Sequence, residues 1–165
     1  MKALSAASIR QFEDAVGALA GYYQTVERGL HVVLKDTAAA SVASGKRGEP
    51  TRLGAIVFGS DHGLCGRFNE EITGYAMDRL DTIDAARDKR LLLAIGARVA
   101  AGLEHAGQAV EDSFPLPGSA SQITAIVHQT LLRIDAWRSR AGVDSVYLFY
   151  NRHARPGPPG VDPEQ

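Results

Sequence analysis

Residues 53–69 read LGAIVFGSDHGLCGRFN, and the fold of the whole chain can be worked out from this segment. An apolar run over residues 53–58 has the length and composition of a strand that is buried on both faces. A glycine-rich turn follows over residues 59–66, and a helical pattern begins at Asn69 and continues to Leu80. Strand, tight turn and helix form the first half of a βαβ unit. In such folds the functional site usually lies at this turn, beyond the carboxyl end of the strand.

The rest of the chain repeats the alternation of strand and helix. Further strands are predicted at residues 91–95, 109–114 and 143–150, and helices at residues 98–106 and from Ser119 or Ser121 up to Gly142, with Trp137 on the apolar face of the second. Gly107 is expected to end the first of these helices in a left-handed conformation, and Gly142 to end the second. We therefore expect an α/β fold, with a Rossmann-like parallel sheet of about four strands within residues 53–155.

Residues 1–35 predict one long helix of the coiled-coil type. Its apolar positions recur at alternating spacings of three and four, which is the seam of a left-handed coiled coil. The seam consists of Ile9, Phe12, Val16, Leu19, Tyr23, Val26, Leu30 and Val33. A partner helix is the favoured interpretation, and packing on the chain's own sheet is the alternative. Residues 36–52 predict a linker, and the proline-rich residues 156–165 predict a disordered tail.

Composition excludes several classes of function. The 165 residues are 45% hydrophobic and 22% charged, as in an ordinary globular protein. A net charge of −1 gives no electrostatic reason to expect binding to nucleic acid or to an anionic membrane. The single cysteine, Cys65, allows no intrachain disulfide, and no apolar run is long enough to cross a bilayer. Membrane contact is therefore expected only through partners.

The glycine-rich turn allows two chemical interpretations. Glycines beside a helix N-terminus can bind phosphate, but the spacing matches neither common nucleotide-binding pattern, and Asp61 places a negative charge there. Alternatively, Cys65 could be a nucleophile activated by His62 and oriented by Asp61, as in a small thiol-dependent α/β enzyme. Side chains so close within one turn rarely align in this way.

A structural interpretation of the turn is favoured over both. In this interpretation Gly63 and Gly66 allow a sharp bend, Cys65 is a small buried apolar residue, Asp61 accepts backbone N–H groups, and Asn69 caps or opens the helix. The other histidines lie at unrelated spacings without acidic or cysteine partners, so no metal site is expected. We expect no catalytic residue and no cofactor.

The turn also carries a family resemblance. Residues 60–69, SDHGLCGRFN, resemble the S-D-[RK]-G-L-C-G-x-[FL]-N signature of the gamma subunit of F-type ATP synthases. Two weaker blocks agree in order and spacing: residues 1–8 resemble the family's AMxMVAAxK helix, and residues 148–152 resemble its strand ending in YNKF. His62 departs from the family's Arg or Lys, and Arg67 stands at a position that is commonly small.

The resemblance implies a non-catalytic rotor subunit of the central stalk. Such a subunit couples ion translocation in the membrane sector to ATP synthesis or hydrolysis in the catalytic head by transmitting torque. The implied partners are the alpha/beta catalytic hexamer, the epsilon subunit and the membrane c-ring, at the cytoplasmic face of a bacterial inner membrane. Compared with the family, the chain is expected to be truncated at both ends. The absent C-terminal helix would be the partner of the seam.

Overall fold

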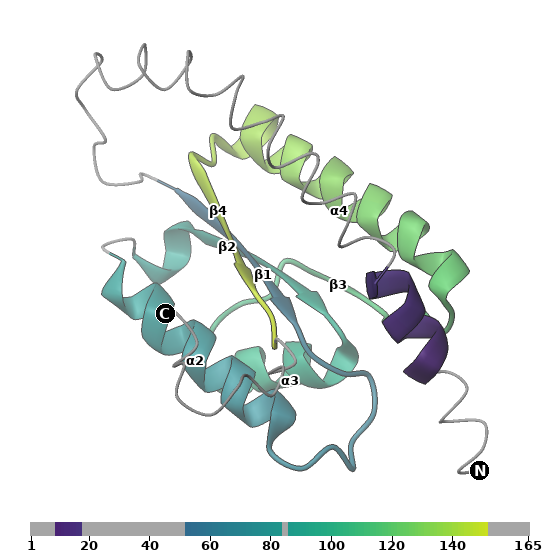
Figure 1. The fold of residues 1–165 in the computed structure, drawn as a ribbon. Coiled ribbons are helices and arrows are strands. Elements are labelled where there is room, and N and C mark those ends of the chain that lie inside the picture. The colour runs from purple at the N-terminus through teal and green to yellow at the C-terminus, as the bar shows by residue number, and fades with distance from the viewer. Residues whose placement is uncertain (1–8, 18–51, 84–85, 152–165) are drawn as a thin grey trace, which may run out of the picture. The chain divides into compact units, whose positions relative to one another are not determined.

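The computed structural model describes residues 9–17, 52–83 and 86–151 (Figure 1). Four parallel strands form one sheet in the order β3-β2-β1-β4, which confirms the expected α/β fold. The strands are β1 (Leu53–Phe58), β2 (Arg90–Ile95), β3 (Asp112–Phe114) and β4 (Ser145–Phe149). The helices are α2 (Phe68–Thr82), the short 3-10 helix η1 (Arg87–Lys89), α3 (Ala97–His105) and α4 (Ala120–Ala141).

The chain divides into two compact units. One comprises Thr51–Leu116 and Trp137–Gln165 and contains the whole sheet with α2 and α3. The other comprises Met1–Pro50 and Pro117–Ala136 and includes most of α4. Only the last turns of α4, from Trp137 onward, therefore belong to the unit that holds the sheet.

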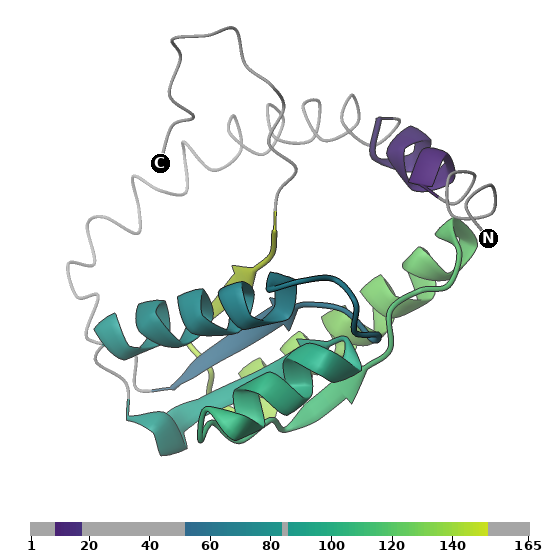
Figure 2. The same cartoon turned by 90° about the horizontal axis from the view of Figure 1, so that it is seen from below.

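The core lies between one face of the sheet and the two helices α2 and α3, which run side by side across it (Figure 2). Alternate residues of β1 face this layer, because successive side chains of a strand point to opposite faces. The cluster consists of Leu53, Ala55, Val57, Ile72, Ala76, Met77, Leu80, Leu92, Ala94, Val99, Leu103 and Phe149. The burial of β1 on both faces explains why its sequence is continuously apolar.

The other face of β1 packs against the buried indole of Trp137. A Cβ atom on Gly54 would lie 2.7 Å from Cε3 of this ring, so glycine is needed for the approach. The indole Nε1 donates a hydrogen bond of 2.5 Å to Oε2 of Glu111, which satisfies its polar atom. The end of α4 is thereby fixed to the sheet.

The expected glycine C-caps are confirmed. Gly107 has φ 77°; its N–H donates to the carbonyl of Glu104, and that of Gln108 donates to the carbonyl of Leu103, both at 3.0 Å. This pair of bonds is the Schellman motif. Gly142 has φ 64° and directly follows α4.

Only the first part of the N-terminal helix lies within the described residues. Residues 9–17 are helical, with Ile9 and Val16 exposed and Phe12 half-buried. The remaining seam positions, Leu19, Tyr23, Val26, Leu30 and Val33, lie outside the described residues, as do the expected linker and tail. The coiled-coil interpretation therefore stays a prediction.

Among the described residues, no helix has both the length and the apolar character that crossing a membrane requires.

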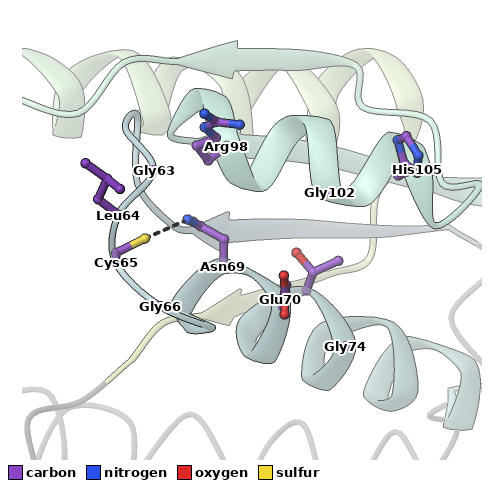
Figure 3. A pocket seen from close by; sticks show the side chains of 11 residues that line it. Gly63, Leu64, Cys65, Gly66, Asn69, Glu70, Gly74, Arg98, Gly102 and His105 are labelled. Carbon is purple, nitrogen blue, oxygen red and sulfur yellow. Dashed lines mark hydrogen bonds between the residues drawn. The ribbon is translucent and has the colours of Figure 1, made fainter.

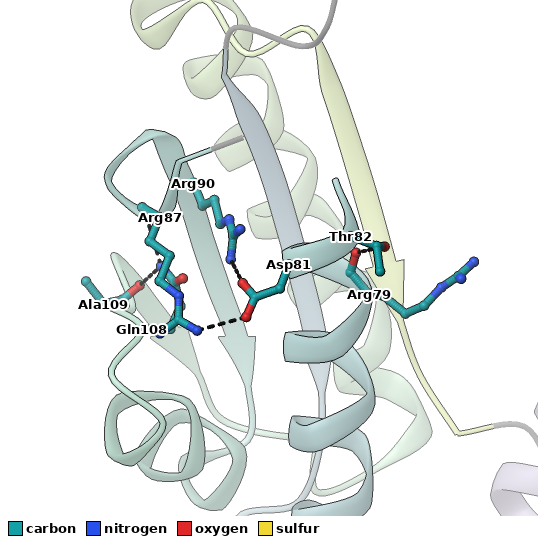
Figure 4. Close-up of polar contacts among 7 residues, drawn as sticks. All are labelled: Arg79, Asp81, Thr82, Arg87, Arg90, Gln108 and Ala109. Atoms are coloured by element: carbon teal, nitrogen blue, oxygen red, sulfur yellow. Dashed lines mark hydrogen bonds and ion pairs between the residues drawn. The ribbon is translucent and has the colours of Figure 1, made fainter. Parts of the chain in front are cut away.

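An ion-pair cluster joins the end of α2 to the start of β2 (Figure 4). The Arg90 side chain is 4% exposed, and its Nη1 donates to Oδ1 of Asp81 at 2.6 Å. Nη2 of Arg87 donates to the other carboxylate oxygen at 2.8 Å. The hydrogen bonds from Arg90 and then Arg87 lower the pKa of Asp81 below its ordinary value of 3.8. The cluster supplies a carboxylate partner to the buried guanidinium of Arg90 at the amino end of β2.

This cluster makes stability sensitive to acid. Because the pKa of Asp81 is lower in the folded chain, its stabilising contribution is fully present above the ordinary value of 3.8 and is lost as the pH falls through the folded pKa. The melting temperature of Asp81→Asn should therefore fall less steeply than that of the parent between about pH 5 and pH 2. Asp78→Asn is the control, since Asp78 is exposed on the same helix without a side-chain hydrogen bond or ion pair to the described residues. Equal slopes for parent and Asp81→Asn would contradict the prediction.

Candidate functional site

The turn after β1 lies against the start of α3. The N–H of Gly59 donates to the carbonyl of Ile95 at 2.8 Å, and the N–H of Arg98 donates to the carbonyl of Ser60 at 2.8 Å. A Cβ atom on Gly59 would overlap the side chain of Val99, and a Cβ on Gly96 would lie 2.9 Å from the backbone N and O of Ser60. The two βα turns are therefore in close contact, and a Cβ atom on either glycine would overlap a neighbour: the Val99 side chain for Gly59 and the Ser60 backbone for Gly96.

Asn69 closes the turn from inside α2. Its Oδ1 accepts the N–H of Ser60 at 2.8 Å, and its Nδ2 donates to Oγ of Ser60 at 2.7 Å and to Sγ of Cys65 at 3.2 Å (Figure 3). The helix itself begins at Phe68, with Arg67 as an N-cap that makes no side-chain capping bond. Asn69 therefore lies at the opening of the helix, which is one of the two expected roles, but it does not cap the helix, because its amide bonds the turn.

Asp61 joins three separate loops at the carboxyl ends of the strands. Its Oδ1 accepts the N–H of Ala97 at the start of α3, and its Oδ2 accepts the N–H of Leu116 after β3, both at 2.8 Å. The carboxylate accepts backbone N–H groups, as the sequence suggests, but from loops 36 and 55 residues away and not from its own turn. A negative charge at the first residue of α3 also interacts favourably with the helix dipole.

The left-handed residues of the turn are Leu64 (φ 65°) and Gly66 (φ 60°). Gly63 does not have a positive φ, and a Cβ atom added there would lie 3.3 Å from Nη2 of Arg98. The Leu64 side chain is fully exposed at the tip. A left-handed leucine with an exposed apolar side chain is an unusual combination for a loop with no partner.

An open pocket of about 640 Å³ lies between the turn, α2 and α3. Arg98 and His105 line it from α3, and Asn69 and Glu70 line it from α2 (Figure 3). Thr73 also lines the pocket, and its buried hydroxyl has no hydrogen-bond partner among the described residues. Sequence reasoning missed Arg98, because nothing in the local pattern indicates that α3 would face this turn.

The thiol-enzyme interpretation finds no support in this geometry. Cys65 Sγ contacts the main-chain carbonyl of His62 at 3.7 Å, and no hydrogen bond within the described residues joins this thiol to the imidazole. The Asp61 carboxylate, which would have to orient the histidine, is already bonded to two backbone N–H groups. The three side chains are therefore neighbours without the alignment that nucleophilic catalysis needs.

The structure gives no support to the nucleotide interpretation of the turn either. That interpretation places a phosphate at the N-terminus of α2, the helix that follows the turn, where Glu70 and Glu71 put two carboxylates in the first helical turn. At the neighbouring N-terminus of α3, the Asp61 carboxylate already accepts the N–H of Ala97. Across the described ranges, no group of three or more His, Cys, Asp or Glu side chains is placed to hold a metal ion.

Cys65→Ser is expected to change the free energy of unfolding by no more than about 0.5 kcal/mol. The expectation that Cys65 is buried is wrong, because the thiol at the surface of this turn is exposed. A serine Oγ can still accept the hydrogen bond from Nδ2 of Asn69. A urea titration measures the effect, with Asn69→Ala as the sensitive comparison, expected to lose about 1–2 kcal/mol with its bonds to Ser60. If parent Cys65 were alkylated much faster than a model thiol, the turn would carry chemistry after all.

Comparisons with known proteins agree with one another. The model of a protein family described as ATP synthase matches residues 1–157. The ATP synthase gamma chain of Caulobacter sp. (strain K31) is 31% identical over 161 residues, which cover 92% of this chain and 53% of that protein. The ATP synthase gamma chain of Parafrankia sp. (strain EAN1pec) is 22% identical over 156 residues, covering 93% and 52%. The chain spans about half the length of the curated relatives it matches.

A solved structure also resembles the fold. The central stalk and c-ring of the mitochondrial ATP synthase of Tetrahymena thermophila, determined by cryo-electron microscopy, contains a chain that is 25% identical in sequence. The match has a TM-score of 0.49 and covers 67% of this chain and 46% of that one.

Proposed function

The chain belongs to the ATP synthase gamma chain family, and on that basis we propose that it acts as part of a central rotor subunit. In this role it couples ion translocation through the membrane sector to ATP synthesis or hydrolysis in the catalytic head. The observation that carries the proposal is the family match over residues 1–157. The proposed mechanism is mechanical: an asymmetric stalk biases the conformations of the catalytic subunits that surround it.

The construction of the turn suits a part that transmits force. Asp61 bonds loops after β1, β2 and β3 to one another, and Gly59 and Gly96 let two of these loops touch. The carboxyl end of the sheet, where these loops lie, therefore resists local deformation, because moving one loop breaks its hydrogen bonds to the others. The exposed Leu64 at the tip then offers a rigidly held apolar contact to a neighbouring subunit.

The N-terminal helix is proposed to be one of the helices that form the shaft. Ile9 and Val16 are exposed apolar residues on a helix whose seam has the period of a coiled coil. In the proposed assembly a second helix covers this seam. Burying each such side chain fully would contribute roughly 1.5–3 kcal/mol.

The proposed partners are the alpha/beta catalytic hexamer, the epsilon subunit and the c-ring. The chain would lie peripherally at the cytoplasmic face of a bacterial inner membrane and touch the membrane only through these partners. It would itself be non-catalytic. The occupied carboxylate of Asp61 and the unaligned Cys65 and His62 support this part of the proposal.

Co-expression tests the proposal directly. A tagged full chain is expressed with the alpha, beta and epsilon subunits encoded in its own genome, and the purified material is analysed by mass spectrometry. We expect the three subunits to copurify with the chain at fixed stoichiometry. Failure of all three to copurify, with the chain itself folded by circular dichroism, would refute the rotor function.

A matched pair of variants links capture to the seam. Val16→Glu places a charge on the exposed seam, whereas Gln11→Glu adds the same charge at an exposed position of the same helix outside the seam. Val16→Glu should reduce capture of the catalytic subunits by at least about tenfold, which corresponds to about 1.4 kcal/mol. Gln11→Glu should leave capture unchanged. Equal effects of the two variants would remove the seam from the proposed interface.

A further inference from the structure

The open pocket between the turn after β1, α2 and α3 carries polar side chains that the proposed rotor function does not use. Its volume of about 640 Å³ lies within the roughly 300–1,000 Å³ that is typical of pockets for small molecules. Figure 3 shows Arg98 and His105 on the α3 side of this pocket and Glu70 on the α2 side. The α3 wall therefore offers hydrogen-bond donors, and the α2 wall offers a carboxylate.

Arg98 can receive an anion at the end of the pocket that is next to the turn. Within the described residues, its side chain takes part in no hydrogen bond or ion pair. The guanidinium lies beside Gly63, where an added Cβ atom would be 3.3 Å from Nη2. A guanidinium presents its N–H groups as a planar fork, which matches both oxygens of one carboxylate.

His105 provides a second donor farther along the same helix. It lies about two helical turns after Arg98, which separates the two Cα atoms by roughly 10 Å along the axis of α3. Its imidazole, like the guanidinium, is unpaired among the described residues. Two carboxylates joined by a chain of about three carbons, with a hydrogen bond of about 2.9 Å at each end, cover a similar distance. The spacing of the two donors therefore suits an elongated ligand.

Between these two donors the pocket holds a hydroxyl without a partner. Thr73 lines the pocket and is only 8% exposed, and its Oγ1 has no hydrogen-bond partner within the described part of the chain. Gly102 faces this hydroxyl from α3, and a Cβ atom there would lie 2.9 Å from Oγ1. A buried hydroxyl that lacks a partner is costly, and a bound group that accepts its hydrogen bond removes this cost.

We propose that this pocket binds a small dicarboxylate, with one carboxylate on the guanidinium of Arg98 and the other on the imidazole of His105. Glu70 repels anions from the α2 wall, so both carboxylates are expected to lie along α3. Because water screens charges in an open pocket, we expect a dissociation constant of about 0.1–5 mM. The inference rests on the pocket alone and does not depend on the proposed rotor function.

Titration of the ¹⁵N-labelled full chain with glutarate, at constant ionic strength, tests the proposal by NMR. The amide signals of Gly74 and Gly102 in the pocket should shift along one saturable curve, and that of Gly142 at the end of α4 should not move. Valerate, which has the same carbon chain but one carboxylate, should bind at least about tenfold more weakly. Absence of saturation with glutarate, or equal affinity for sulfate, would overturn the proposal.

Variants assign each end of the ligand to its residue. Arg98→Gln should weaken glutarate binding at least about tenfold. Arg79→Gln, the same change at an exposed position of α2 outside the pocket, should have no effect. His105→Ala should weaken glutarate to the level of valerate and leave valerate unchanged, a difference that a merely structural role would not produce.

Thr73→Val tests the unpartnered hydroxyl. It keeps the approximate shape of the side chain and should weaken glutarate about threefold, while the denaturant midpoint stays equal or rises, since an unpaired polar group has been removed. Unchanged glutarate affinity in Arg98→Gln, or equal losses for glutarate and valerate in His105→Ala, would contradict the proposed placement of the two carboxylates.

Discussion

Replacing Gly96 with alanine is expected to lower the free energy of unfolding by about 3–5 kcal/mol. Gly96 has φ 117° and ψ 128°, a backbone conformation that residues with a Cβ atom rarely adopt. A Cβ here would also lie 2.9 Å from the N and O atoms of Ser60. These are backbone atoms fixed by the bond between the carbonyl of Ser60 and the N–H of Arg98, so they cannot move away cheaply. Strain and overlap each cost about 1–3 kcal/mol and act together at this position.

Alanine variants of two other glycines, compared in a guanidinium chloride titration, separate the cost of conformational strain from the cost of steric overlap. Gly66 has φ 60° with nothing within 4 Å of its Cβ position, so Gly66→Ala should cost only the conformational strain, about 1–2 kcal/mol. Gly74 lies inside α2 with nothing within 4 Å, and Gly74→Ala should stabilise the chain by about 0.5–1 kcal/mol. If Gly96→Ala cost no more than Gly66→Ala, the contact between the two turns would be unimportant for stability.

The elements that carry a local signal could be predicted from sequence. The strand at Leu53–Phe58 was predicted with its observed bounds, because a continuous apolar run is what burial on both faces demands. Gly107 was identified as a C-cap because it follows the last periodic residue of α3, and glycine reaches a left-handed φ without strain. Parallel pairing followed from the alternation of strands and helices.

The contacts that connect distant segments could not be predicted. Nothing near Asp61 in the sequence indicates that its two acceptor atoms would bond Ala97 and Leu116. The pairing of Asp81 with the buried Arg90 likewise depends on how α2 returns to the sheet. Within the turn itself, the family signature did point to one residue that matters. The signature ends at Asn69, and the Asn69 side chain bonds both Ser60 and Cys65.

Asp61→Ala is the second substitution with a large expected effect. It leaves the N–H groups of Ala97 and Leu116 without their carboxylate acceptor, and hydrogen bonds to charged groups contribute about 1.5–3 kcal/mol each. Because Asp61 is partly exposed, water can replace part of this loss, so we expect a net cost of about 2–3 kcal/mol. Asp78→Ala removes the same charge from an exposed helical position and should cost less than about 0.5 kcal/mol.

Hydrogen exchange shows whether the loss arises at the three joined loops. In Asp61→Ala the amides of Ala97 and Leu116 should exchange much faster, whereas that of Gln108, bonded to the carbonyl of Leu103 at the other end of α3, should change only with global stability. Asp61→Asn keeps one acceptor oxygen but turns an NH₂ donor toward the second N–H group, so it should recover at most half of the lost stability. An unchanged denaturant midpoint for Asp61→Ala would mean that water serves these N–H groups as well as the carboxylate does. The stiffness inferred for the carboxyl end of the sheet would then have to come from the close contacts of Gly59 and Gly96 alone.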